Sequence, residues 1–150
     1  YAAETLVGQA VGAREPARFS RAVGLSTLWA LALGAVASLC IAVAGGPFID
    51  LMTVDGSVRE IARHYLGWAA LTPFLGAACF LFDGIFTGAM ATRDMRNMMV
   101  LSLAIYLAAW FVLEPRFGNH GLWAALSVFF IARSLSFAAR LPAIRVRAFA

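Results

Sequence analysis

The stretch AVGLSTLWALALGAVASLCIAVAGGPFI, residues 22 to 49, decides the fold class because it contains no charged residue. A helix needs about 20 apolar residues to cross the roughly 30 Å hydrocarbon core of a bilayer. This stretch is longer than that, and it lacks the polar stripe that a helix on the surface of a soluble protein carries. We therefore expect it to cross a membrane.

The whole chain has the composition of a membrane protein. Of its 150 residues, 62% are hydrophobic and 13% are charged, whereas soluble domains contain roughly 45 to 50% apolar and about 25% charged residues. Further apolar runs occupy residues 64 to 82, 97 to 113 and 121 to 139, and a shorter run precedes Arg14. The sequence predicts an all-α, polytopic transmembrane helix bundle with about four full spans plus the end of a fifth helix.

The connections between these runs set the expected helix boundaries. Residues 44–57 contain the Gly and Pro of a turn, followed by Asp55 or Ser57 as a helix N-cap. TRDMRN, residues 92–97, reads as a tight polar connection, and 114–121 as another turn. We expect helices over about residues 1–13, 17–45, 58–92, 95–113 and 119–140. Residue 1 does not resemble a natural start, so we expect the chain to be part of a longer protein.

The arginines predict the orientation in the membrane. All 12 basic residues are arginines, and nine of them are assigned to one side of the membrane: Arg14, Arg18, Arg21, Arg93, Arg96, Arg133, Arg140, Arg145 and Arg147. Cytoplasmic loops hold the basic excess, so we expect a multi-pass protein of the inner membrane with a cytoplasmic C-terminus. This topology and the anionic bilayer account for the net charge of +4. We expect no nucleic-acid partner.

Asp83 lies in one of the most apolar parts of the chain, FLFDGIFTGAM, residues 80 to 90. It precedes Arg93 by ten residues, which at about 1.5 Å per residue places it about 15 Å from the arginine-rich side, near the bilayer midplane. An aspartate there costs about 2.5 to 3.5 kcal/mol and usually marks an ion, proton or substrate path. The alternative is an Asp held by a hydroxyl or backbone donor for packing alone. Glu4 precedes Arg14 by the same ten residues.

Three further features concern helix geometry. Pro73 predicts a kink in the helix over 58–92, and this bend either takes part in conformational change or is only structural. Two small-xxx-small pairs predict that another helix approaches closely: Gly8 with Gly12, and Gly84 with Gly88. For Arg133 we favour a side chain that extends to the membrane surface over one that pairs with a charge inside the bundle.

No pattern supports an enzyme. The chain has no Gly-rich phosphate loop, no serine elbow and no HExxH motif. Cys40 and Cys79 lack the spacing of a metal site, so we expect no metal and no cofactor. His64 and His120 fall in outer loops or at helix ends, where an interfacial role is more common than a catalytic one.

Four segments, in their order and separation, resemble the C-terminal part of the multidrug and toxic compound extrusion (MATE) transporters, most closely the DinF-like branch. They are ETLVGQAVGAR (4–14), FDGIFTGA (82–89), TRDMRN (92–97) and FGNHGLWAAL (117–126). The resemblance implies a twelve-helix antiporter of two lobes that exports cationic or amphipathic compounds in exchange for H⁺ or Na⁺. This chain would form most of the second lobe, from the eighth helix to the twelfth, and would pair with an N-terminal lobe.

The resemblance also implies roles for residues. Asp83 falls where many members carry an acidic residue of the cation site on the tenth helix, and Glu4 lies near it on the eighth. The implied mechanism is alternating access, in which H⁺ or Na⁺ at Asp83 competes with a cationic substrate while bending near Pro73 helps to switch the cavity. Two alternatives are a lipid-linked oligosaccharide flippase of the same superfamily, with several arginines in its cavity, and a non-transporting membrane subunit.

Overall fold

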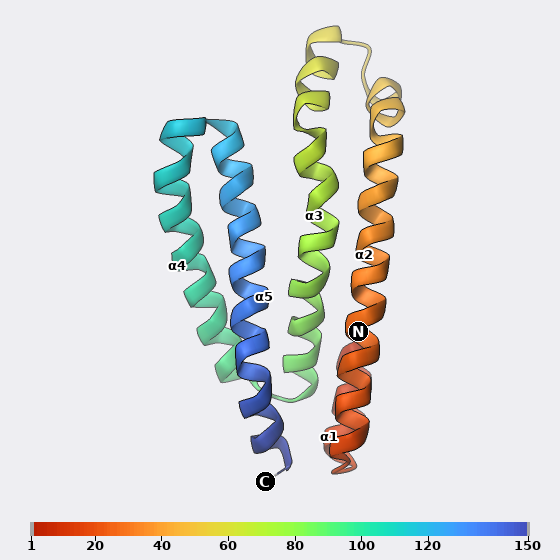
Figure 1. Ribbon diagram of the computed structural model, residues 1–150, viewed down its shortest axis with the longest axis vertical. Coiled ribbons are helices and arrows are strands. Elements are labelled where there is room, and N and C mark those ends of the chain that lie inside the picture. Colours follow the sequence, from red (N-terminus) through yellow and green to blue (C-terminus); the bar gives the residue numbers. More distant parts are fainter. Residues whose placement is uncertain (1, 150) are drawn as a thin grey trace.

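The computed structural model describes residues 2 to 149, which form five helices and no strand (Figure 1). The helices are α1 (Ala2–Gly12), α2 (Pro16–Met52), α3 (Gly56–Gly88), α4 (Thr92–Phe117) and α5 (Asn119–Phe149). Each of α2 to α5 is long and apolar enough to cross a membrane. The prediction of an all-α transmembrane bundle is confirmed.

Two antiparallel hairpins make up the bundle. Helices α2 and α3 pack along each other, as do α4 and α5, and the hairpins meet through contacts between α3 and α5 (Figure 1). The short helix α1 packs against α2 and α3. Helix α3 is therefore the central element, with α2 and α1 on one side and the α4–α5 hairpin on the other.

One end of the molecule collects most of the arginines, and we call it the arginine-rich end. The α1–α2 turn, the α3–α4 turn and the C-terminal part of α5 lie there, at the bottom of Figure 1. These connections and the adjoining helix turns carry Arg14, Arg18, Arg21, Arg93, Arg96, Arg140, Arg145 and Arg147. Arg133 is the exception, because it lies in the middle of α5.

Helix α2 is longer than the sequence predicted. The expected turn at 44–57 shrinks to residues 53–55, because α2 continues through Pro47 to Met52. The reason lies in the packing against α3. Gly45 is buried and leaves just enough room for the Leu66 side chain of α3. Beyond Pro47, which removes one backbone donor, Arg59 of α3 donates to the carbonyls of Asp50 at 2.8 Å and Thr53 at 2.7 Å.

The α3–α4 connection also differs from the expectation. The segment 92–97 is the first turn of α4 rather than a loop, and α3 ends at Gly88 rather than near residue 92. Only residues 89–91 connect the two helices. Met90 has a left-handed φ of 53°, and the Ala91 N–H donates to the Phe86 carbonyl at 2.9 Å, which closes the end of the helix. Helices α4 and α5, over residues 92–117 and 119–149, are longer than the expected 95–113 and 119–140.

Asp55 caps α3, as one of the two residues predicted to do so. Its carboxylate accepts hydrogen bonds from the Ser57 N–H at 2.8 Å and the Ser57 hydroxyl at 2.6 Å, and a longer one from the Val58 N–H at 3.4 Å. These bonds, led by the one from the Ser57 hydroxyl, lower the pKa of Asp55 below its usual value.

The buried core lies near the arginine-rich end and ties four helices together. Val7 of α1, Phe19 of α2, Phe86 of α3 and Phe137 of α5 are all at most 1% exposed. Elsewhere many large apolar side chains face outward, among them Trp29, Leu33, Phe80 and Phe111, each more than 60% exposed. Such a surface suits lipid, because hydrocarbon solvates apolar side chains as well as a protein core does.

Candidate functional site

Asp83 of α3 and Arg133 of α5 form an ion pair inside the bundle. One guanidinium nitrogen of Arg133, Nη2, donates to Asp83 Oδ1 at 2.8 Å and to Oδ2 at 2.9 Å. The Arg133 side chain is 9% exposed and that of Asp83 is 22% exposed. The expectation that Arg133 extends to the membrane surface is corrected: it turns toward α3, where the carboxylate replaces the hydration that its charge gives up.

Two aromatic rings flank the guanidinium of Arg133. Phe129 and Phe137 precede and follow Arg133 by one turn of α5, and their ring centres each lie 5.7 Å from the guanidinium carbon. Phe137 also packs edge-on against Phe86 of α3, with ring centres 4.4 Å apart. The rings hold the two charges in a region of low dielectric, where attraction between them is stronger than in water.

Two buried polar atoms in the middle of α5 have no partner among the described residues. Arg133 Nε and Ser134 Oγ are buried, and neither makes a hydrogen bond to a side chain or backbone group within residues 2–149. Buried donors without partners are uncommon.

Glu4 lies where α1 crosses α3, and the contact is formed around Gly8, Gly84 and Gly88. A β-carbon built on Gly84 would lie 3.6 Å from the Glu4 backbone nitrogen, and one on Gly88 would collide with the Glu4 carbonyl oxygen. On Gly8 it would lie 3.5 Å from the Gly88 carbonyl oxygen. Gly12 differs from the other three predicted packing glycines, since a β-carbon there would meet nothing within 4 Å.

The structure brings Asp83 together with Arg133 but not with Glu4. Asp83 turns toward α5, whereas the neighbouring Gly84 meets α1, and successive helix residues point about 100° apart. Glu4 has no ion-pair partner among residues 2–149. The two acids therefore lie at a similar level on different sides of α3.

The depth of Asp83 also needs correction. The estimate of about 15 Å counted ten residues along a continuous helix to Arg93. Because α3 ends at Gly88, Asp83 lies about five residues, or about 7.5 Å, from the end of its helix. The acid is therefore closer to the arginine-rich end than the sequence suggested.

Pro73 lies where α2 and α3 touch. Helix α3 runs through it without interruption. The N–H of Phe74 donates to the Ser38 hydroxyl of α2 at 3.1 Å. A β-carbon on Gly34 would lie 3.1 Å from the Pro73 carbonyl oxygen, so the backbones approach closely here. A hydroxyl from a neighbouring helix is one way in which membrane proteins satisfy backbone groups near a proline.

A histidine pair joins α3 and α5 at the opposite end of the molecule. The Nε2 atoms of His64 and His120 lie 2.8 Å apart, and the Trp68 indole donates to His120 Nδ1 at 3.0 Å. Both histidines were expected in outer loops or at helix ends, but no local pattern pairs them, since they are 56 residues apart. Within residues 2–149, no three His, Cys, Asp or Glu side chains gather into a metal site.

Comparison with known proteins decides the family. The family model described as MatE matches residues 1–112. The chain belongs to the MatE family. The match includes Glu4, Pro73 and Asp83, while Arg133 lies beyond it. This MatE chain is also 38% identical over 145 residues to the DNA damage-inducible protein F of Escherichia coli (strain K12).

That alignment covers 93% of this MatE chain and 30% of the relative, so the chain spans about a third of the relative's length. No solved structure matches it. The resemblance seen in the sequence motifs is confirmed by both comparisons. MatE proteins are transporters, which agrees with the absence of enzyme motifs from the sequence.

Proposed function

We propose that this chain forms most of the second lobe of a MatE transporter, which exports cationic or amphipathic compounds in exchange for H⁺ or Na⁺ by alternating access. Family membership, four helices able to cross a membrane and a charged pair inside the bundle support this proposal. The arginine-rich end would face the cytoplasm of a cell with an inner membrane. An N-terminal lobe of the same protein would complete the pathway.

The observation that carries the proposal is the ion pair between Asp83 and Arg133. Because Asp83 is ionisable, its protonation would change the contact between α3 and α5. When Asp83 takes up a proton, the charge of Arg133 loses its counter-charge in a region of low dielectric, which is costly. Protonation would then favour a state in which α5 moves away from α3. Loss of the proton would restore the pair, so the two protonation states would stabilise two conformations.

The geometry of the pair supports H⁺ rather than Na⁺ as the coupling ion. Both oxygens of Asp83 already accept from Arg133. A hard cation needs several oxygen ligands at once, whereas a proton needs a single oxygen. A cationic substrate would compete for the same carboxylate once Arg133 has withdrawn, and Glu4 would contribute a second acid at a similar level. Bending near Pro73 would assist the change of access.

The test is Asp83→Asn in the intact transporter that contains this chain. We expect coupled export of a cationic dye to be lost while the amount of protein in the membrane stays normal. The measurement is dye transport by inverted vesicles under an imposed pH gradient without Na⁺, and then with Na⁺. Glu60→Gln is the matched control, because Glu60 is an exposed acid on the same helix, and it should transport normally.

Other outcomes would point to the alternatives. Full export by Asp83→Asn would contradict the proposed coupling site. If neutralising Glu4 and Asp83 together changed only stability, a non-transporting subunit would be the better description. A protein that moved lipid-linked oligosaccharides but accumulated no dye would be a flippase.

A further inference from the structure

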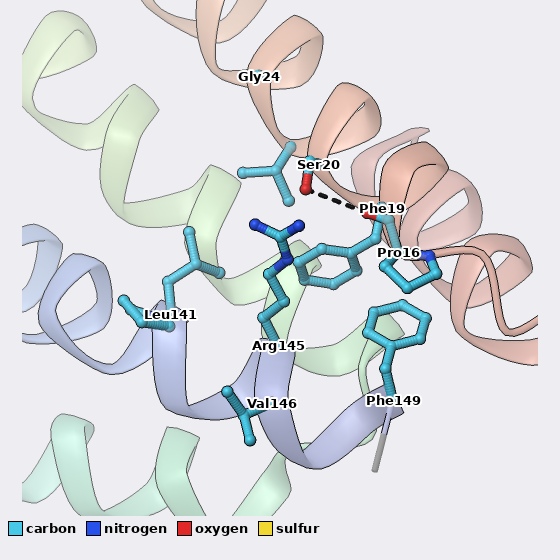
Figure 2. A pocket seen from close by; sticks show the side chains of 10 residues that line it. Pro16, Phe19, Ser20, Gly24, Leu141, Arg145, Val146 and Phe149 are labelled. Atoms are coloured by element: carbon cyan, nitrogen blue, oxygen red, sulfur yellow. Dashed lines mark hydrogen bonds between the residues drawn. The ribbon is translucent and has the colours of Figure 1, made fainter.

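A cleft of about 810 Å³ separates the first turns of α2 from the last turns of α5 at the arginine-rich end (Figure 2). Its walls are apolar: Phe19 and Val23 come from α2, and Leu141, Val146 and Phe149 from α5. The rings of Phe19 and Phe149 touch edge to face, with centres 5.6 Å apart. This contact joins two helices that otherwise diverge.

One charged group enters this cleft. Arg145 of α5 lies between Phe19 and Leu141, and its guanidinium points toward α2 (Figure 2). It makes no hydrogen bond or ion pair within residues 2–149, whereas Arg147, two residues later, donates to Asp94 at 2.8 Å. The nearby hydroxyl of Ser20 is already used, since it donates to the Pro16 carbonyl at 3.1 Å.

An apolar cleft with a single unpaired guanidinium suits a molecule that has an anionic group and a hydrocarbon chain. Guanidinium groups bind phosphate with two parallel hydrogen bonds. Arg18 and Arg21 lie on the adjoining turns of α2 and make the surroundings positive, which attracts anionic lipid. The chain spans a bilayer, so such molecules surround it at high local concentration.

We propose that the cleft between α2 and α5 binds one anionic phospholipid from the leaflet at the arginine-rich end. Its phosphate accepts hydrogen bonds from Arg145, and one acyl chain lies against Phe19, Val23 and Leu141. The lipid fills the space between α2 and α5. This site is distinct from the Asp83–Arg133 pair, and it requires neither ion coupling nor transport, so each proposal can fail without the other.

The test uses the longest natural form of the protein that contains residues 1–150, purified in detergent. Native mass spectrometry counts the phosphatidylglycerol molecules retained as the lipid is titrated, and phosphatidylcholine serves as the uncharged comparison. Wild type should retain one phosphatidylglycerol in preference to phosphatidylcholine. Arg145→Gln should weaken this retention by at least about tenfold, the loss expected when even one hydrogen bond to a charged group is removed.

Arg140→Gln is the matched control, because it removes the same charge from the same helix outside the cleft. It should leave retention nearly unchanged. A second variant, Gly24→Leu, fills the cleft from α2, where a β-carbon would meet nothing within 4 Å. It should also release the lipid. Gly46→Leu, an equally open position on the same helix, should not. Elution as a single species shows that each variant is folded.

Several results would overturn the proposal. Equal weakening by Arg140→Gln would show diffuse attraction to the arginine-rich end instead of a site. Equal retention of phosphatidylcholine would remove the role of the charge. Equally tight binding of soluble glycerol phosphate would identify a site for free anions. Unchanged retention in both Arg145→Gln and Gly24→Leu would mean that protein occupies the cleft, either another segment or a second copy.

Discussion

At the scale of single residues, Asp83 and Arg133 act as one electrostatic unit. As a pair they are neutral, and the aromatic rings of Phe129 and Phe137 keep the surroundings apolar. Removing either charge leaves the other without a partner inside the bundle, which costs far more than the pair itself contributes. Stability and function at this site therefore depend on both residues together.

We expect Arg133→Gln to lower the free energy of unfolding by about 1 to 3 kcal/mol. Breaking a fully buried pair costs about 3 to 5 kcal/mol, and the smaller figure allows for the 22% exposure of the Asp83 side chain. Thermal unfolding in detergent, followed by circular dichroism, measures the change. The double variant Asp83→Asn with Arg133→Gln should recover part of the loss, because no charge then remains unpaired. A double variant no more stable than Arg133→Gln would contradict this account.

We expect the stabilisation of α3 by the Asp55 cap to depend on pH only under acidic conditions. The pKa of Asp55 is lowered in the folded protein, so its cap stabilises α3 fully above the unfolded value of about 3.9. That stabilisation disappears as the pH falls through the lowered pKa. Protection of the Ser57 and Val58 amides from hydrogen exchange, relative to intrinsic rates, should fall only in that range. Asp55→Asn, which caps without ionising, should show no such step.

At the scale of elements, the α1–α3 crossing depends on close backbone approach. The contact runs from Glu4 and Gly8 of α1 to Gly84 and Gly88 of α3. These helices pack mainly through van der Waals contact, since lipid solvates apolar side chains as well as protein does. Small residues bring the backbones near enough for that contact to hold α1 in place.

We expect Gly88→Ala to destabilise this crossing by about 1 to 3 kcal/mol, as overpacking usually does, because its β-carbon would collide with the Glu4 carbonyl. Gly84→Ala should cost less, since the nearest atom would lie at an ordinary contact distance of 3.6 Å. Gly12→Ala is the control, with nothing within 4 Å, and should be neutral. Thermal unfolding of the three variants measures the order of these losses of stability. Equal losses in all three would argue against a close crossing.

Some features of the helices follow from the sequence, whereas others depend on how the helices pack. Residues 22–49 predicted a membrane span because the absence of charge is a local property of the chain. The end of α2 was missed because its contacts come from α3, where Arg59 donates to the Asp50 and Thr53 carbonyls. The partner of Asp83 was missed for the same reason. Arg133 lies 50 residues away, and its direction follows from how α5 packs on α3, which no local pattern records.

At the scale of the whole molecule, the distribution of charge and apolar surface defines how the bundle sits in a bilayer. Apolar side chains face outward along the helices, and arginines gather at one end. The α2–α3 connection lies at the other end and carries Val54, which is 94% exposed. Both ends are therefore open to reagents dissolved in water.

We expect the two ends to be labelled from opposite sides of the membrane. In a background with Cys40→Ala and Cys79→Ala, a membrane-impermeant maleimide added outside intact cells should label Val54→Cys. It should label Glu15→Cys, in the α1–α2 turn, only after the membrane is permeabilised. The reverse pattern would place the arginine-rich end outside and contradict the orientation proposed from the arginines.

The hydrogen bond between Phe74 and Ser38 has a mechanical consequence for any transport cycle. The residue that follows Pro73 is fastened to α2, and Gly34, one turn before Ser38, packs against the Pro73 carbonyl. A change in the bend of α3 must therefore either break this bond or carry α2 with it. If the bond persists, α2 and α3 rotate as one rigid body. The sliding surface of the lobe is then the α3–α5 interface, where the Asp83–Arg133 ion pair and, at the opposite end, the His64–His120 contact hold the two bodies together.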